Sequence, residues 1–200
     1  MLIEPSQKSL KSRLRKEIRQ KRAAINPEQR AQWDTQLNSN LVDYAGRNVP
    51  GVVAAYMAFD GEPDLAPALT WLDGQGATLA LPVVQDAPGK PVITFRQWSP
   101  GEDLVPNRFG IAEPAGARDI HATDIDLVLV PLVGWDRAGG RLGMGASFYD
   151  RLFQPFAELE RPLRMGVGYE LQRVSCIPGE PWDVRLHSVL TENGWFTCEE

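Results

Sequence analysis

Four glycines cluster in residues 139–146, between the most apolar stretch of the chain and a segment with a helical pattern. Glycine lets a backbone approach an oxyanion closely, and the free N–H groups at the start of a helix supply donors and a positive dipole. In an open α/β sheet, ligands bind at the carboxyl ends of strands, where this loop is expected to lie. The segment therefore predicts an anion-binding loop, and the alternative is a glycine-rich connection that binds nothing.

The loop matches neither common phosphate-binding motif in full. Residues 140–147 have the spacing of a P-loop, but Ala146 stands where that motif requires lysine. Residues 143–148 begin as a dinucleotide-binding fingerprint, but Phe148 replaces its last glycine. An anion bound here needs a cation from another part of the chain.

Positive charge is concentrated near the N-terminus. Residues 8–22 contain eight basic residues and one acidic residue, a net charge of +7, which leaves −12 for the rest of a chain whose net charge is −5. A basic arm on an acidic body favours an anionic ligand, either a nucleic acid or a small phosphate compound. Lys8, Lys11 and Arg15 share one helical face, and we expect them to supply the missing cation.

Two carboxylates could hold a metal ion beside the loop. Asp150 follows the loop directly, and Asp183 lies in the sequence Pro-Trp-Asp. Mg²⁺ is typically bound by one or two carboxylates together with phosphate oxygens and water. For Asp150 the spacing equally allows an acid that complements the helix dipole or pairs with Arg151.

Apolar patterning predicts the elements that position these residues. We expect a basic amphipathic helix over residues 8–25 and a second helix that begins at Pro27 with Asn26 as its N-cap and Gln29 completing a capping box. Further strands are expected at 52–59, 78–84, 92–98, 125–133 and 163–169, helices at 64–72 and 147–159, and a long ordered loop with a small strand at 99–124. The order predicts an α/β fold: one three-layer α/β/α domain over residues 1–200, with a mostly parallel central sheet and residues 125–133 as its central strand.

Composition excludes several other classes. Hydrophobic residues make up 43% and charged residues 24% of the chain, which is ordinary globular composition. No stretch approaches the ~20 apolar residues of a membrane helix, and no apolar segment typical of a secretory signal follows the basic N-terminus. Cys176 and Cys198 belong to no metal or redox motif, so we expect free thiols and a cytoplasmic protein without a membrane partner.

Residues 141–151, Arg-Leu-Gly-Met-Gly-Ala-Ser-Phe-Tyr-Asp-Arg, resemble the signature of the 5-formyltetrahydrofolate cyclo-ligase (5,10-methenyltetrahydrofolate synthetase) family. The resemblance extends over nearly the whole chain. Its other landmarks are Lys11 with Arg15, Tyr56 to Glu62-Pro63, Leu81-Pro82, Phe95 with Trp98, Gly110-Ile111 with Glu113-Pro114, Pro131 to Asp136, Gly166 with Gly168-Tyr169 and Gln172, Asp183, and Thr191-Glu192.

The resemblance implies a ligase that uses MgATP to close a folate ring. 5-Formyltetrahydrofolate, with or without a polyglutamate tail, would be converted to 5,10-methenyltetrahydrofolate with release of ADP and phosphate. The formyl oxygen would take the γ-phosphate, and N10 would then attack the formyl carbon. Such chemistry needs positioning and charge neutralisation more than a covalent nucleophile.

The resemblance also implies roles for individual residues. Arg141 and Tyr149 would be catalytic, and Asp150 and Asp183 would hold Mg²⁺. ATP would be bound by Lys8, Lys11, Arg15, Arg141, Leu142, Gly143, Met144, Gly145, Ala146, Ser147, Phe148 and Tyr149. The folate would be bound by Met57, Glu62, Trp98, Met144, Gly145, Ala146, Ser147 and Phe148.

The chain departs from the common family pattern within the loop, where Ala146 and Ser147 replace residues that are often glycine or lysine and Phe148 replaces tyrosine. The Cβ of Ser147 requires a negative φ or some backbone strain. Two rivals stay open. One is a sugar-phosphate isomerase or transferase on a similar scaffold. The other is a nucleic-acid-binding protein using the basic helix, although helix-turn-helix, RNP and zinc patterns are absent and we expect no nucleic-acid partner. We expect a monomer.

Overall fold

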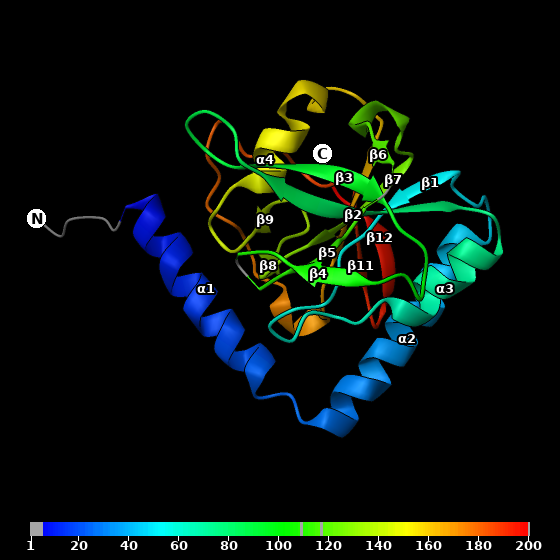
Figure 1. The fold of residues 1–200 in the computed structure, drawn as a ribbon. Helices are drawn as coiled ribbons and strands as arrows, with labels where there is room; N and C mark the ends of the chain where they lie inside the picture. Colours follow the sequence, from blue (N-terminus) through cyan, green and yellow to red (C-terminus); the bar gives the residue numbers. More distant parts are fainter. Residues whose placement is uncertain (1–5, 109, 117, 200) are drawn as a thin grey trace, which may run out of the picture.

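The computed structural model describes residues 6–108, 110–116 and 118–199, and its centre is an eight-stranded sheet (Figure 1). The strand order is β12-β11-β10-β7-β1-β2-β3-β6, and the four pairings from β11 to β2 are parallel. The strands are β1 (Val52–Ala54), β2 (Thr78–Gln85), β3 (Val92–Gln97), β6 (Asp119–Ile120), β7 (Leu127–Pro131), β10 (Leu163–Val167), β11 (Ser188–Thr191) and β12 (Gly194–Thr197). The expected mostly parallel α/β sheet is confirmed, and β7 lies inside it.

Helices cover both faces of this sheet. On one face, α2 (Pro27–Ala45) and α3 (Ala66–Gly74) bury Leu37, Leu41 and Leu69 against β1, β2 and β7. On the other face, the short helix α4 (Phe148–Phe153) buries Phe153 in a second cluster with Val128 and Val130 of β7. Because β7 is buried on both faces, its continuous apolar run is the pattern of a central parallel strand.

Several expected elements are shorter than the sequence pattern indicated, β7 among them. β1 ends at Ala54, and the apolar run continues only because Ala55 and Tyr56 are buried in the core as the chain leaves the sheet. α4 ends at Phe153 and becomes a 3₁₀ turn at Gln154–Phe156, since Pro155 has no N–H to continue the α-helical bonds. β10 ends at Val167, two residues earlier than expected.

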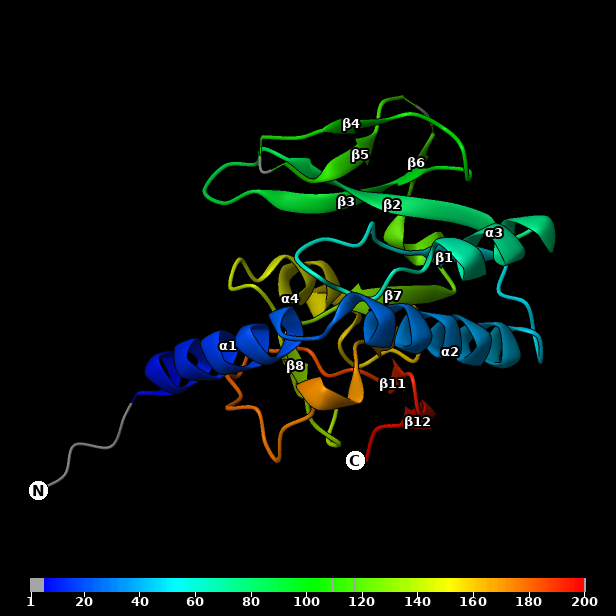
Figure 2. The ribbon, with the colours of Figure 1, turned by 90° about the horizontal axis from the view of Figure 1, so that it is seen from below.

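The stretch 99–124 contains more structure than one small strand. β4 (Leu104–Pro106) and β5 (Ala112–Pro114) pair in an antiparallel sheet, which forms a separate layer over β2 and β3 (Figure 2). The Glu113 carboxylate joins the layers, because its Oε1 accepts from the Val84 N–H at 2.8 Å and from Asn107 Nδ2 at 2.6 Å. This layer becomes one wall of the cavity described below.

The basic helix α1 (Gln7–Ala23) lies across the end of the sheet rather than on a face of it (Figures 1 and 2). Ile18 is its one buried apolar side chain, and it packs in a small cluster with Val133, Leu142 and Ile177. α2 follows with the expected cap, because the Asn26 side chain accepts from the Gln29 N–H at 2.8 Å. α1 therefore rests on a hairpin, β8 (Gly134–Trp135) with β9 (Arg141–Leu142), that follows β7.

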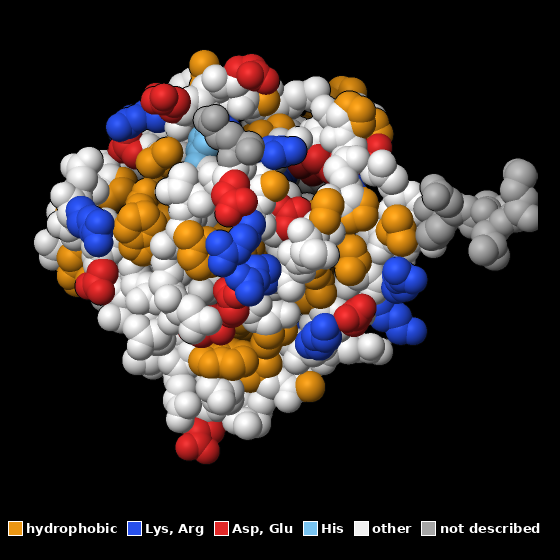
Figure 3. Space-filling view, turned by 180° about the vertical axis from the view of Figure 1, so that it is seen from behind, with side chains coloured by type: hydrophobic (Ala, Val, Ile, Leu, Met, Phe, Trp, Pro, Cys, Tyr) orange, Lys and Arg blue, Asp and Glu red, His pale blue; other side chains and the backbone are white. Residues whose placement is uncertain are grey.

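The surface carries no continuous basic area on the face turned away in Figure 1. Figure 3 shows that blue and red side chains alternate over this face with small apolar groups between them. Within the described part of the chain, no helix has both the length and the apolar character needed to span a membrane. Cys176 and Cys198 are free thiols, as expected.

The seat of α1 on the hairpin allows a test of this packing. A Cβ added at Gly134 would lie 2.6 Å from Ile18 Cδ1, so Gly134→Ala should lower the free energy of unfolding by about 1–2 kcal/mol through overpacking. Ile18→Val removes that methyl group and alone costs about 0.5–1.5 kcal/mol. We expect the double variant to lose less than the sum of the two in urea unfolding. Strictly additive losses would show that α1 does not press on Gly134.

Candidate active site

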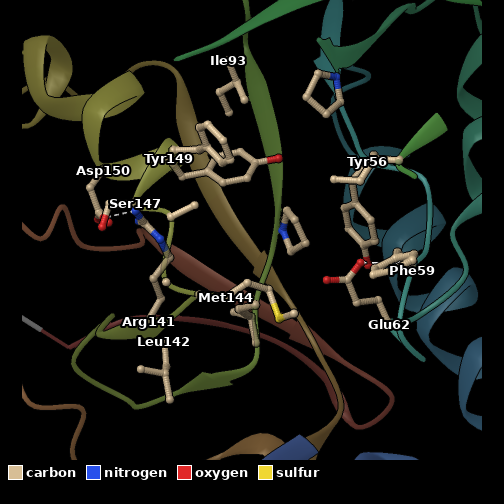
Figure 4. A pocket seen from close by; sticks show the side chains of 18 of the residues that line it. Tyr56, Phe59, Glu62, Ile93, Arg141, Leu142, Met144, Ser147, Tyr149 and Asp150 are labelled. Atoms are coloured by element: carbon tan, nitrogen blue, oxygen red, sulfur yellow. Dashed lines mark hydrogen bonds and ion pairs between the residues drawn. The ribbon is translucent and has the colours of Figure 1, made fainter. Parts of the chain in front are cut away.

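A cavity of about 240 Å³ opens where the chain leaves the carboxyl end of β7 (Figure 4). One end is charged and is lined by Lys11, Arg15, Arg141, Asp150 and Asp183. The opposite end, called the Glu62 end here, is lined by Tyr56, Met57, Phe59 and Glu62. Residues 143–149 form the wall shared by both ends, and the apolar side chains Pro82, Val84, Ile93 and Ile111 line the remainder. The loop thus lies at a strand end, as the sequence predicts.

Two cations reach the charged end from α1. Lys11 Nζ contacts Asp183 Oδ2 at 2.6 Å, and Arg15 Nε donates to the Gly143 carbonyl at 2.8 Å. Lys8, which the sequence grouped with them, is exposed and is not among the residues that line the cavity. Lys8 lies in the first turn of α1, seven residues before Arg15, so it shares the helical face of Arg15 but lies outside this cavity.

Arg141 supplies a third cation from within the loop. Its side chain is 6% exposed, donates to the Val184 carbonyl at 2.7 Å and pairs with Asp150 through Nη2 (Figure 4). Burial lowers the pKa of Arg141, and the charges of Asp150 and Asp183 oppose that shift. Asp150 therefore pairs with Arg141, not with Arg151 as one alternative had it.

The loop adopts a conformation that glycine favours, but at one position a serine adopts it. Ser147 precedes α4 with a φ of +51° and a ψ of +33°, so this residue accepts the backbone strain instead of taking a negative φ. Arg151 holds the strained turn, because it donates to the Ala146 carbonyl at 2.8 Å and to the Pro91 carbonyl at 2.7 Å. Its guanidinium also lies 5.3 Å from the centre of the Phe148 ring.

Glu62 is the carboxylate at the other end, and it points toward the middle of the cavity opposite Met144 (Figure 4). Burial raises the pKa of Glu62 to about 7, although the Phe59 N–H and the charge of Arg22 act in the opposite direction. Glu62 in turn contributes to raising the pKa of Tyr56 and of Tyr149. Both phenols therefore stay protonated near neutral pH and can donate hydrogen bonds.

Asp150 and Asp183 can bind a metal ion only through carboxylate oxygens that the ion pairs do not use. The ion pairs described above use Oδ1 of Asp150 and Oδ2 of Asp183, which leaves the second oxygen of each carboxylate for a metal ion. Among the described residues, no group of three or more His, Cys, Asp or Glu side chains could hold a metal ion. Two carboxylates facing one cavity fit Mg²⁺, which completes its shell with phosphate oxygens and water. They do not form a closed protein cage.

Trp98 does not lie where the sequence placed it. It is 6% exposed, belongs to the core cluster with Leu81, and donates through Nε1 to the Glu102 carbonyl at 3.4 Å instead of lining the cavity. Sequence reasoning gave no site role to several lining residues, namely Phe59, Val84, Ile93, Ile111 and Leu132. Apolar residues are equally expected in the hydrophobic core, so the sequence alone does not distinguish these lining residues from core residues.

The arrangement suits one kind of chemistry. None of the described lining residues is His or Cys, so the cavity offers no nucleophile paired with a histidine base. It offers cations and free backbone at one end and a carboxylate facing an apolar compartment at the other. Such a site can neutralise a phosphate and hold a flat, hydrogen-bond-donating ring beside it.

Comparison with known proteins gives this geometry a family. The model of the 5-formyltetrahydrofolate cyclo-ligase family matches residues 7–192. The 5-formyltetrahydrofolate cyclo-ligase of Escherichia coli K12 is 34% identical over 176 residues, which cover 87% of this chain and 96% of the relative. That of Mycolicibacterium smegmatis is 34% identical over 186 residues, 90% of this chain and 93% of the relative.

Solved structures agree with the sequence relatives. The NMR structure of Aquifex aeolicus 5,10-methenyltetrahydrofolate synthetase has a TM-score of 0.79 and 30% identity, and the match covers 96% of this chain and 94% of that one. The synthetase of Mycoplasma pneumoniae, at 23% identity and a TM-score of 0.74, shares the fold over 91% of this chain and 98% of its own. The resemblance found in the sequence is confirmed, and the chain belongs to the 5-formyltetrahydrofolate cyclo-ligase family.

Proposed function

We propose that this protein is an ATP-dependent 5-formyltetrahydrofolate cyclo-ligase that forms 5,10-methenyltetrahydrofolate, ADP and phosphate. The observation that carries the proposal is the single cavity that joins a cationic, glycine-lined end to an apolar end containing Glu62. Phosphoryl transfer between two bound molecules needs both compartments to open into one space. Family membership supports the same reaction, because the relatives named above are cyclo-ligases or methenyltetrahydrofolate synthetases.

The cationic end would bind the nucleotide. Lys11 and Arg15 would contact the phosphates, the backbone of residues 141–149 would wrap around them, and Arg141 would stabilise charge on the transferred phosphoryl group. Since α1 supplies two of these cations, residues 1–200 would act as one unit with the basic helix as part of the nucleotide site. Lys8, outside the cavity, has no part in this proposal.

The Glu62 end would bind the pterin. The Glu62 carboxylate would accept from the ring N–H donors, and Met57 and Met144 would pack against its faces. The formyl oxygen would attack the γ-phosphorus as the bond to the β-phosphate oxygen breaks and ADP leaves. N10 would then bond to the formyl carbon and lose its proton, and the C–O bond to phosphate would break. Tyr149, whose hydroxyl points into the cavity, would donate to the oxygen that becomes phosphorylated (Figure 4).

Asp150 and Asp183 would hold a magnesium ion against the phosphates. Mg²⁺ neutralises charge that develops on phosphate oxygens and orients them when it is bound. Lys11 and Arg141 would then share the two carboxylates with the metal ion. A polyglutamate tail on the substrate, a monomeric state and a cytoplasmic location remain predictions.

Direct assay tests the proposed function. Mixing the purified protein with MgATP and 5-formyltetrahydrofolate should produce the absorbance of methenyltetrahydrofolate, with one ADP released for each product. A sugar-phosphate isomerase would release no ADP. A nucleic-acid-binding protein would bind RNA more tightly than MgATP, in a strongly salt-dependent manner. Absence of both methenyltetrahydrofolate and ADP would overturn the proposal.

The cations of α1 give a matched series of variants. Lys11→Ala and Arg15→Ala each remove a charge-assisted contact worth about 1.5–3 kcal/mol, so the Kd for a non-hydrolysable MgATP analogue should rise about tenfold to a hundredfold. Lys8→Ala, on the same helix but outside the cavity, should leave this Kd unchanged in calorimetry. Wild-type affinity in both cavity variants would show that α1 has another role.

The aspartates are expected to respond differently. Asp183→Asn keeps the size of the side chain and an oxygen that can accept from Lys11, but removes the charge that would face the metal ion, so turnover should fall by orders of magnitude while the thermal midpoint moves only slightly. Higher Mg²⁺ concentrations should partly restore turnover, since weaker metal binding is a mass-action defect. Asp150→Asn removes the counter-charge of buried Arg141 and should also cost about 1–3 kcal/mol of stability in urea unfolding.

Rescue by magnesium separates the metal role from the pairing role. A loss of turnover in Asp183→Asn that is the same at every Mg²⁺ concentration would remove that residue from the metal site. Normal turnover of both variants at low Mg²⁺ would leave the cavity without a protein ligand for the ion.

A further inference from the structure

The Glu62 side chain is presented by a tight turn, Phe59 to Glu62, whose backbone is unusual. The Glu62 N–H donates to the Phe59 carbonyl at 3.0 Å, and the Phe59 N–H donates back to Glu62 Oε2 at 3.2 Å. Between them, Asp60 has a φ of +52° and Gly61 a φ of +77°, two successive left-handed residues as in a type I′ turn. Glycine adopts this conformation freely, but aspartate does so at some cost.

Side chains of α1 hold this turn from outside. Asp60 Oδ2 accepts from Arg19 Nε and from Arg22 Nη2, both at 2.9 Å. The Arg22 side chain is 1% exposed, and its Nη1 also donates to the Leu132 carbonyl at 3.3 Å. A buried guanidinium without a counter-charge is costly, so the pairing of Arg22 with Asp60 is strongly favoured.

A third arginine, from α2, also contacts the turn. Arg30 Nη1 donates to the Gly61 carbonyl at 2.6 Å, and its Nη2 donates to the Arg22 carbonyl at 2.9 Å. A Cβ at Gly61 would lie 2.9 Å from Arg30 Nη1, so the turn and the arginine are in close contact. Both residues that directly precede Glu62 in the turn are therefore fixed by α1 and α2.

These contacts attach α1 to the body of the protein, and their location next to Glu62 indicates a second role. They act on the residues next to Glu62, and its carboxylate has one described hydrogen bond, from the same turn. α1 is also continuous from Lys11 and Arg15, at the cationic end of the cavity, to Arg22 at the Glu62 end. One helix thus sets the position of both ends relative to each other.

We propose that Asp60 is a positioning residue: by joining Arg19 and Arg22, it fixes the turn and so directs the Glu62 carboxylate at the pterin of 5-formyltetrahydrofolate. The inference rests on the proposed function and assigns to Asp60 no contact with either substrate. It predicts that disturbing Asp60 weakens use of the folate but not of the nucleotide.

Kinetics of two Asp60 variants test the inference. Asp60→Gly keeps the turn conformation accessible but removes both ion pairs, so KM for 5-formyltetrahydrofolate should rise about tenfold, while KM for MgATP stays within about twofold. Asp60→Asn tolerates a positive φ and retains an oxygen acceptor, so it should restore most of the loss. Equal increases in both KM values would mean that Asp60 only anchors α1 to the body of the protein, and would overturn the inference.

Matched controls use the same helix. Glu17→Gln breaks an exposed ion pair with Lys21 on α1 and should leave both KM values unchanged. Arg19→Gln removes one of the two donors to Asp60 from a half-exposed side chain, and should give a smaller rise in KM for the folate. It keeps the inference testable where Asp60→Gly fails to fold. A wild-type KM for the folate in Arg19→Gln would contradict a positioning role.

The pH profile gives a second readout, which reports how close Asp60 lies to the Glu62 carboxylate during turnover. The groups whose charge acts on Glu62 are Asp60 beside it and Arg22 of α1, and the phenols Tyr56 and Tyr149, which burial and the charge of Glu62 keep protonated, also face it. The charge of Asp60 raises the pKa of Glu62, and that of Arg22 lowers it. Since the folate needs an ionised Glu62, kcat/KM should fall below a pH of about 7, and this limb should move to lower pH in both Asp60 variants. An unmoved limb would count against the inference.

Hydrogen exchange separates failure of the inference from failure of the proposed function. The amides of Phe59 and Glu62 should exchange faster in Asp60→Gly than in the wild type, whatever the activity. If the wild type makes methenyltetrahydrofolate and these amides exchange at unchanged rates, the positioning role alone is wrong. If the wild type makes none, the proposed function is wrong and the inference falls with it.

Discussion

The glycine loop has Ala146 where a P-loop has lysine, so further positive charge must reach it from a separate element. α1 supplies such charge, since it lies across the end of the sheet instead of covering a face, and Arg15 bonds there to the Gly143 carbonyl. A helix in this place has little apolar surface to bury, and it is held by Ile18 and by its arginines. The charged end of the cavity therefore depends on polar contacts of one N-terminal helix, which supplies Lys11 and Arg15.

Local patterns predicted the parts of the fold that local physics determines. β7 was recognisable because a strand buried on both faces needs a continuous apolar run, and the start of α2 because Asn26 and Pro27 satisfy the orphan N–H groups of a first turn. The position of the loop at a strand end followed from the same order of elements. Arg15 was expected at this loop because the loop lacks its own lysine and the basic helix offers cations, whereas Asp183 was placed there mainly by resemblance to a family.

Two expected site residues lie outside the cavity, because a sequence pattern determines a face or a length but not which part of the fold lies opposite it. Lys8 is on the same helical face as Arg15, yet seven residues along the helix, about 10 Å, place it outside the cavity. Trp98 follows an alternating strand and points to the core instead of the cavity. Asp60 gave no signal, since an Asp-Gly turn is common and its partners are about 40 residues away.

Charge pairing explains how so many cations can share one cavity. Lys11 contacts Asp183, Arg141 contacts Asp150, and Arg22 near the Glu62 end contacts Asp60, so these three cations are each paired with a carboxylate, whereas Arg15 donates to the Gly143 carbonyl. Without these carboxylates the cations would repel one another and would lose hydration on burial, and both effects would destabilise the folded state. Because the paired cations are already held in place, the proposed binding of a phosphate would cost less free energy for ordering their side chains. Carboxylates of the acidic body therefore line the same cavity as the basic arm, because Asp183 holds Lys11 of that arm at the charged end, where the proposed function places the phosphates.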